Sequence, residues 1–181
     1  MFNEPLIIDN ALPRQIADRI EDYVFSPIFP WRYLDDITKS DEEYNKTMAF
    51  GHVFLDSMRN SSESHSTLFL FLLFTALDKA GIQSDAKVHL GRLFLQLPLL
   101  HRKFHNTAHI DLDFDHYVAL YYVNDTDGDT FFFTGPDAGT ITRRISPKKN
   151  RIVFFNGKEY HSSSNPTTTK RCVINFDFTL T

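Results

Sequence analysis

Three side chains that could bind one metal ion lie in the second half of the chain. His109 and Asp111 are separated by one residue, within residues 107–111, which we predict to form a β-strand. Because side chains alternate between the two faces of a strand, both would point to the same side. His161 follows a second predicted strand and a turn. Two histidines and one carboxylate are the ligand set that holds Fe(II) and leaves positions open for other ligands.

A candidate anion-binding residue, Arg171, follows His161 by ten positions. The segment between them contains a turn signal centred on Pro166. If this segment is a symmetric hairpin, His161 and Arg171 lie opposite one another, with their Cβ atoms about 5 Å apart. The planar guanidinium would then lie beside the metal, where it could bind a carboxylate through two hydrogen bonds.

The elements that must position these residues fall into two zones. The first zone, residues 1–85, predicts two helices, which begin near residue 12 and residue 64, a loop over 26–47 and a strand over 48–55. The second zone, residues 86–181, predicts short strands separated by turn sequences, over 88–97, 107–111, 116–123, 130–134, 140–145, 151–156, 160–163 and 171–180. Short strands at regular spacing are typical of a sandwich or barrel. We expect a single domain, mainly β with N-terminal helices, whose jelly-roll core is covered by those helices.

Composition excludes several classes of protein. The chain has 181 residues and one cysteine, which excludes a disulfide framework and any zinc site with several cysteines. Its longest apolar stretch, around residues 68–77, is about half as long as a membrane-spanning helix; we expect it to be a helix buried against the sheet. Without a signal-peptide pattern, the expected location is the cytoplasm. The net charge of −4, divided into −7 for residues 1–85 and +3 for residues 86–181, argues against a nucleic-acid partner.

The candidate ligands belong to a longer pattern that resembles a known family. The pattern consists of H-I-D at 109–111, A-L-Y-Y-V-N at 119–124, Gly128, N-R-I-V-F-F-N-G at 150–157 and H-x9-R-C-V-I-N-F-D-F at 161–178. Over residues 88–180 it is similar to the 2-oxoglutarate- and Fe(II)-dependent oxygenases, in particular to their prolyl-4-hydroxylase-like branch. The resemblance implies a double-stranded β-helix core with His109, Asp111 and His161 as iron ligands.

For the co-substrate, the resemblance implies that Arg171 and Tyr122 bind the distal carboxylate of 2-oxoglutarate. One position departs from the family pattern: Gln96-Leu97-Pro98 stands where many relatives have L-Y-P, so that Leu97 replaces a tyrosine near the co-substrate. The implied reaction uses Fe(II), 2-oxoglutarate and O2 to hydroxylate a C–H bond, with release of succinate and CO2. A peptidyl proline-like side chain or a small molecule would be the substrate, in a cavity lined by the Phe-rich strands. Small single-domain members also resemble bacteriophage proteins, which would work in the cytoplasm of a host cell.

Two other functions stay open at this level. One is a non-catalytic jelly-roll binding module, in which the three candidate ligands are surface or capping residues, Arg171 forms a surface salt bridge and Tyr122 packs in the core. The other is a cupin-type metalloenzyme that uses O2 without a keto acid. The sequence gives no indication of the oligomeric state.

Several other reactive residues have simpler interpretations. His101, His105 and His116 are expected in loops or at the surface, although His105 could touch the substrate. The basic residues between 143 and 151 are expected to form a solvated face. Cys172 is adjacent to Arg171 on a predicted strand, so it should point away from the site as a buried structural thiol.

Overall fold

The computed structural model describes residues 2, 4–37, 46–64, 66–99, 104–136 and 139–181. Its helices are α1 (Arg14–Val24) and α2 (Ser66–Lys79), with a short 3-10 helix, η2 (Ser57–Arg59). The strands, in chain order, are β1 (Leu6–Asp9), β2 (Arg32–Leu34), β3 (Ala49–Asp56), β4 (Ser61–Ser62), β5 (Ala86–Gln96), β6 (Tyr117–Tyr122), β7 (Thr130–Phe133), β8 (Ile141–Ile145), β9 (Arg151–Asn156), β10 (Tyr160–Ser163) and β11 (Arg171–Leu180). Among the described residues, no helix combines the length and the hydropathy that crossing a bilayer requires.

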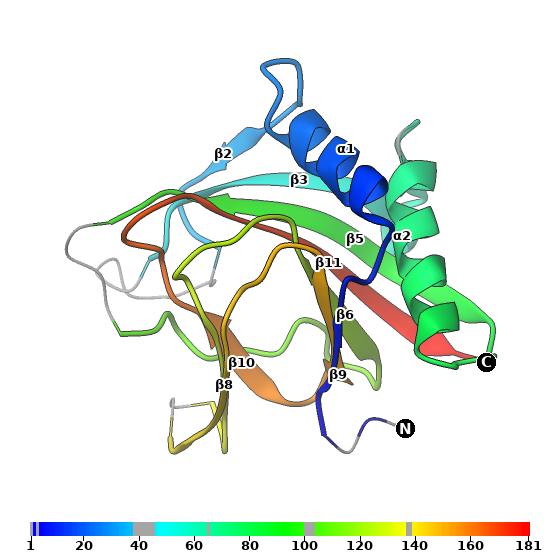
Figure 1. The fold of residues 1–181 in the computed structure, drawn as a ribbon. Coiled ribbons are helices and arrows are strands. Elements are labelled where there is room, and N and C mark those ends of the chain that lie inside the picture. The colour runs from blue at the N-terminus through cyan, green and yellow to red at the C-terminus, as the bar shows by residue number, and fades with distance from the viewer. Residues whose placement is uncertain (1, 3, 38–45, 65, 100–103, 137–138) are drawn as a thin grey trace.

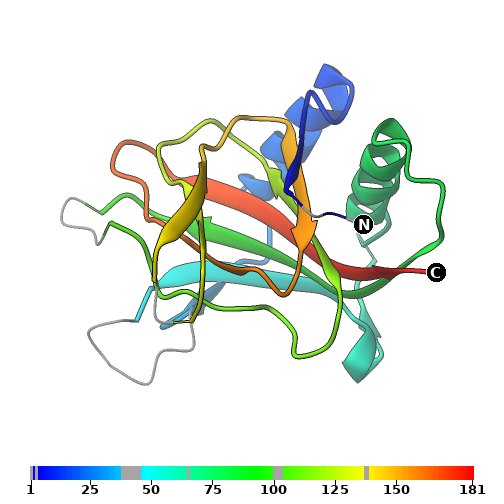
Figure 2. The ribbon, with the colours of Figure 1, turned by 90° about the horizontal axis from the view of Figure 1, so that it is seen from below.

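The strands form two antiparallel sheets. The large sheet has the order β1-β9-β6-β11-β5-β3-β2, with β4 paired to β3, and the small sheet has the order β10-β7-β8. Both helices lie on one side of the large sheet and the small sheet lies on the other (Figure 1). Seen from below, β11, β5 and β3 run side by side through the middle of the molecule (Figure 2). The predicted fold class, a jelly-roll core covered by helices, is confirmed.

The side chains of β11 alternate between the side of the large sheet that faces the helices and the side that faces the small sheet. Its apolar members pack in the core between the large sheet and the helices: Cys172, Ile174, Phe176 and Phe178. The intervening members include three polar residues with at most 5% of their surface exposed: Arg171, Asn175 and Asp177. Because successive side chains point to opposite faces of a strand, these buried polar groups face the small sheet. A cluster of buried polar side chains therefore lies between the two sheets.

The core between the large sheet and the helices, here called the helix-side core, can be tested with a single substitution. Phe176 is fully buried there, and its ring centroid lies 5.6 Å from that of Phe54. We expect Phe176→Ala to lower the free energy of unfolding by about 3–5 kcal/mol, because it removes buried apolar surface and leaves a cavity. The control Phe71→Ala, on the outer face of α2 where Phe71 is 54% exposed, should change it by about 0.5 kcal/mol or less. Urea denaturation followed by circular dichroism measures both, and equal effects would contradict this packing.

The first zone differs from the prediction in two respects. It contributes strands β1 and β2 at the two ends of the large sheet, whereas helices, one strand and a loop were expected. With four and three residues, β1 and β2 are too short to show a periodic apolar pattern. Helix α2 covers the sheet but is not buried all round, since Leu68, Phe71 and Phe74 are between 36% and 54% exposed. The predicted strand over 48–55 is confirmed as β3, while residues 38–45 of the predicted loop lie outside the described residues.

The uneven charge of the two zones is explained by ion pairs within the fold. Arg151 binds Asp9 of β1 with an Nε–Oδ1 distance of 2.7 Å, and Lys149 lies 2.5 Å from carboxylate oxygens of both Asp18 and Glu21 on α1. The other basic residues of this cluster also have acidic partners: Arg143 with Glu4 and Glu159, Arg144 with Asp129, and Lys148 with Asp9. The basic cluster is partly solvated, as predicted, since the side chains of Arg144 and Lys148 are 57% and 51% exposed. Its ion pairs with Glu4, Asp9, Asp18 and Glu21 also join it to the acidic first zone.

Candidate metal centre and co-substrate cavity

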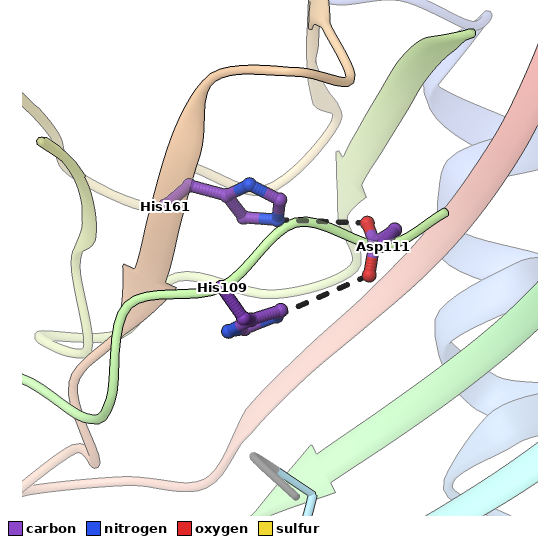
Figure 3. Close-up of side chains that lie close together, drawn as sticks. All are labelled: His109, Asp111 and His161. Carbon is purple, nitrogen blue, oxygen red and sulfur yellow. Dashed lines mark ion pairs between the residues drawn. The ribbon is translucent and has the colours of Figure 1, made fainter. Parts of the chain in front are cut away.

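The three candidate metal ligands converge on one point. One possible ligand atom from each of His109, Asp111 and His161 lies within 4.8 Å of the others. The Nε2 atom of His161 is 3.5 Å from Oδ2 of Asp111, and Nε2 of His109 is 3.9 Å from Oδ1 (Figure 3). These distances are longer than good hydrogen bonds and suit three ligands that surround one ion.

A single backbone bridge brings the two histidines together. The amide of each residue donates to the carbonyl of the other, with both N–O distances equal to 3.0 Å. After His109 the chain is irregular and runs away from β10. Asp111 lies in this irregular segment and contacts Arg92 and Asn175 of the large sheet. The predicted strand over residues 107–111 is therefore wrong, although its histidine and aspartate still reach one cavity.

Both imidazoles are oriented by a backbone carbonyl two residues earlier in the chain. Nδ1 of His109 is 3.1 Å from the Thr107 carbonyl oxygen, and Nδ1 of His161 is 3.0 Å from that of Glu159. Because a carbonyl can only accept, Nδ1 carries the hydrogen in each ring and the lone pair of Nε2 is left for another ligand. Metal-binding histidines are commonly fixed in this way. Two Nε2 atoms and one carboxylate are a donor set that fits Fe(II).

The guanidinium of Arg171 lines the same cavity as these three side chains. The cavity has a volume of about 110 Å³, and Arg171 is 3% exposed. Its Nε donates to the Gly128 carbonyl (2.8 Å), Nη1 to Oε1 of Gln96 (3.0 Å) and Nη2 to Oγ1 of Thr130 (3.0 Å). In the described part of the chain, three of its five N–H donors thus have an acceptor, which leaves two for a ligand. A buried cation with free donors is suited to bind a carboxylate.

His161 and Arg171 do not form a hairpin. Strand β10 pairs with β7 in the small sheet, whereas β11 pairs with β5 and β6 in the large sheet. The two side chains therefore face the cavity from opposite sheets, because the segment between them crosses from one sheet to the other. The predicted hairpin is wrong, while the predicted presence of both residues in one site agrees with the cavity lining.

Sequence comparison finds relatives for part of the chain. No family model matches the sequence. Prolyl 3-hydroxylase 2 of Mus musculus is 41% identical over 70 residues, a match that spans 37% of this chain and a tenth of that relative's length.

Solved structures match over almost the whole chain. An oxidoreductase of the 2OG-Fe(II) oxygenase family from Burkholderia pseudomallei has a TM-score of 0.70 at 11% identity, covering 97% of this chain and 84% of its own. The chain has the fold of the 2-oxoglutarate- and Fe(II)-dependent oxygenases. A prolyl hydroxylase from Trichoplax adhaerens, in complex with a hypoxia inducible factor peptide fragment, has a TM-score of 0.66 at 12% identity, with 98% and 84% coverage. HygX from Streptomyces hygroscopicus, with nickel, 2-oxoglutarate and hygromycin B bound, has a TM-score of 0.59 at 11% identity, with 96% and 82% coverage.

Within this oxygenase fold, Tyr122 lies behind Arg171 and does not line the cavity. It is fully buried, and its ring centroid is 5.7 Å from Cζ of Arg171. Its hydroxyl donates to Oγ1 of Thr130 (2.7 Å), which also accepts from Arg171. Burial raises the pKa of this hydroxyl above its ordinary value, so it remains a donor. Tyr122 is therefore linked to the guanidinium through Thr130.

The neighbourhood of Leu97 also differs from the prediction. Leu97 is 48% exposed and is not among the residues that line the cavity, whereas Gln96 is fully buried and faces it. Nε2 of Gln96 donates to Oγ of Ser163 (3.1 Å) while its Oε1 accepts from Arg171, so the amide holds the guanidinium in place. The cavity wall contains one phenylalanine among its described residues, Phe94. The expected Phe-rich lining is wrong, because most of the buried phenylalanines pack toward the helices or between the sheets.

Three polar residues around Asp111 were missed by the sequence analysis. Arg92 donates through Nη2 to Oδ1 of Asp111 and to Oδ2 of Asp177, both at 2.8 Å. Asn175 donates through Nδ2 to Oδ2 of Asp111 at 3.2 Å. Asn175 and Asp177 share the face of β11 with Arg171, and this alternation was the signal that could have found them. Arg92 had no comparable signal.

The protonation states of Asp111 and His109 suit metal binding. Burial by itself would raise the pKa of Asp111, but the Arg92 guanidinium and the two imidazoles hold it well below its usual range. Burial and the neighbouring His161 lower the pKa of His109 to about 4. Burial lowers the pKa of His161, but its contact with Asp111 outweighs this and raises it overall. At neutral pH Asp111 is thus anionic and His109 neutral, as metal ligands have to be.

The remaining histidines have different surroundings. His116 was expected in a loop or at the surface. It does lie outside the regular strands, but it is only 3% exposed, and its Nε2 is 3.7 Å from Oδ1 of Asp177. His105 packs against the rings of Phe131 and Phe133, at centroid distances of 5.9 and 4.8 Å. His101 lies outside the described residues.

Proposed function

We propose that this chain is an Fe(II)- and 2-oxoglutarate-dependent dioxygenase that hydroxylates a C–H bond and produces succinate and CO2. The observation that carries the proposal is one cavity that contains both a two-histidine, one-carboxylate cluster and the buried guanidinium of Arg171. A binding module with a structural metal, or a cupin-type enzyme that uses no keto acid, has no need for a buried cation with free donors in the same cavity. The oxygenase is therefore favoured over both alternatives.

The cavity has two ends, one suited to bind the metal and the other to bind a carboxylate. When bound, Fe(II) supplies a centre at which 2-oxoglutarate and O2 can react. His109, Asp111 and His161 would hold the metal at one end. At the other end Arg171, oriented by Gln96 and Thr130, would bind the distal carboxylate, with Tyr122 behind it.

Apolar side chains lie between these two ends. Leu120 and Val173 line the cavity together with Phe94. They would limit the access of water to the co-substrate, which strengthens electrostatic interactions inside the site. This arrangement would fix both ends of an extended keto acid and leave its middle in an apolar environment.

The substrate class is proposed from the relatives. The matched prolyl 3-hydroxylases and the prolyl hydroxylase structure favour a proline-containing peptide, whereas the HygX structure holds hygromycin B. We therefore propose a peptidyl proline-like side chain as the first class to test and a small molecule as the second.

A turnover assay tests this function directly. Protein incubated with Fe(II), 2-oxoglutarate and O2 is expected to form succinate slowly, and faster when a hydroxylatable peptide from a proline-containing panel is present. A chelator should abolish the reaction, because it removes the metal that the three ligands hold. Succinate is measured by NMR. In parallel, Co(II) at about a hundred times its Kd should stabilise the fold by about 2.7 kcal/mol. A chain that forms no succinate and shows no stabilisation by Co(II) or 2-oxoglutarate would instead be a binding module.

A further inference from the structure

A second buried guanidinium, that of Arg92, lies at the metal end of the cavity and is not explained by co-substrate binding. Its side chain is 17% exposed, and one nitrogen, Nη2, bridges two carboxylates at 2.8 Å. One of these belongs to Asp111 and the other to Asp177, which is fully buried. Because a buried guanidinium with two carboxylate partners is held firmly, Arg92 has a fixed position next to the metal ligand.

The two oxygens of Asp111 have different partners. Arg92 and Asn175 lie directly opposite one another in the pairing of β5 with β11. Arg92 contacts Oδ1 at 2.8 Å with a charged donor, and Asn175 contacts Oδ2 at 3.2 Å with a neutral one. Charge-assisted hydrogen bonds are shorter and about twice as strong as neutral ones. Oδ2 is also the oxygen that lies 3.5 Å from Nε2 of His161. Nε2 of His109 lies farther away, 3.9 Å from Oδ1. The guanidinium therefore contacts Oδ1, while Oδ2 has no charged donor and is the oxygen closer to an imidazole.

We propose that Arg92 restricts Asp111 to one metal-binding oxygen and thereby keeps a coordination position open for the co-substrates. This inference rests on the proposed function. Two imidazoles and one oxygen leave three of six positions open. A keto acid that chelates through two oxygens, together with O2, needs all three. A second oxygen from Asp111, or one from Asp177 released by loss of Arg92, would take one of them.

Loss of the Arg92 charge is predicted to affect the affinity for the metal and the affinity for 2-oxoglutarate differently. Replacing Arg92 with a neutral residue removes a positive charge from beside a site for a divalent cation. Metal affinity should therefore stay the same or increase, because the repulsion between the two cations disappears. The affinity of the metal-loaded protein for 2-oxoglutarate should fall, since an open position is lost. A residue that merely stabilised the fold would not separate the two affinities in this way.

Binding measurements on Arg92→Met and Arg92→Lys test the proposal. Co(II) is titrated into each protein by calorimetry, and 2-oxoglutarate is then titrated into the Co(II)-loaded form. For Arg92→Met we expect a Co(II) Kd equal to or below that of the wild type and a 2-oxoglutarate Kd at least about tenfold higher. The change in the visible Co(II) spectrum that 2-oxoglutarate causes in the wild type should be lost. Arg92→Lys, which keeps a cation and a donor at this position, should restore most of the co-substrate affinity.

Two further variants make the result unambiguous. Arg151→Met removes an arginine–aspartate ion pair, with Asp9, that is remote from the metal, and should change neither Kd. Arg92→Gln keeps a polar side chain and is expected to behave like Arg92→Met, so it replaces that variant if methionine prevents folding. A 2-oxoglutarate Kd within threefold of wild type in the neutral variants would overturn the proposal, as would a Co(II) Kd more than tenfold higher. If the wild type itself binds neither Co(II) nor 2-oxoglutarate, the proposed function fails, and the inference with it.

Discussion

The Asp111→Ala variant is expected to lose iron-dependent succinate formation by more than about 100-fold. Asp111 is the one carboxylate in the cluster of three candidate ligands. Without it, the two imidazoles remain, and of its two carboxylate partners the Arg92 guanidinium keeps Asp177. Loss of a group that merely hydrogen-bonds to a metal ligand costs about 10–100-fold in metal affinity or activity. Loss of the charged ligand itself should therefore cost more.

Two measurements together identify the cause of the loss. Initial rates of succinate formation give the effect on turnover, and thermal unfolding with and without Co(II) reports metal binding. The wild type should be stabilised by Co(II), whereas Asp111→Ala should not. The control Asp113→Ala replaces an exposed aspartate two positions along the chain and should retain turnover within about twofold. A folded Asp111→Ala protein that kept normal turnover would show that Asp111 is not a metal ligand.

The parts of the site that local sequence determines were predictable. On β11, alternation places Arg171 toward the cavity and Cys172 toward the helices, and Cys172 is indeed 1% exposed within the helix-side core. The strands that follow one another with clear turn signals, from β5 to β11, were predicted close to their observed bounds. In these segments, the side-chain period of a strand and the chemistry of its turns decide the structure.

The parts that depend on pairing between distant segments were not predictable. The chain between β10 and β11 looks like a hairpin, yet these strands belong to different sheets, and β11 lies between β5 and β6. Alternation determines which face a side chain takes but not which strand lies next to it. The contacts of Arg92 show the same limit. Its two carboxylate partners come from an irregular segment and from a distant strand, 85 residues further along the chain in the case of Asp177.

Arg171→Met is expected to raise the KM for 2-oxoglutarate at least about 30-fold while the Co(II) Kd stays within about threefold of the wild-type value. Truncating one partner of a buried, hydrogen-bonded charge pair costs about 2–5 kcal/mol, and 1.4 kcal/mol corresponds to a factor of ten in affinity. The metal should be little affected, because Arg171 contacts Gly128, Gln96 and Thr130 and none of the three ligands. Steady-state kinetics with varied 2-oxoglutarate give the KM, and calorimetry gives the Co(II) Kd.

The matched control for this experiment is the neighbouring cation, Lys170. Its Nζ lies 3.8 Å from the centroid of the Phe25 ring, and Lys170 does not line the cavity. Lys170→Met therefore removes the same charge at nearly the same place in the chain without removing a donor from the site. If both variants raised the KM equally, the effect would be one of long-range charge and not of a carboxylate site at Arg171. If Arg171→Met left O2-dependent turnover and the KM unchanged, the keto acid would not bind there, and a cupin-type metalloenzyme would account better for the metal cluster. An increase confined to Arg171 is the result that only the oxygenase predicts, because only that enzyme requires a distal carboxylate to be held across the cavity from the metal.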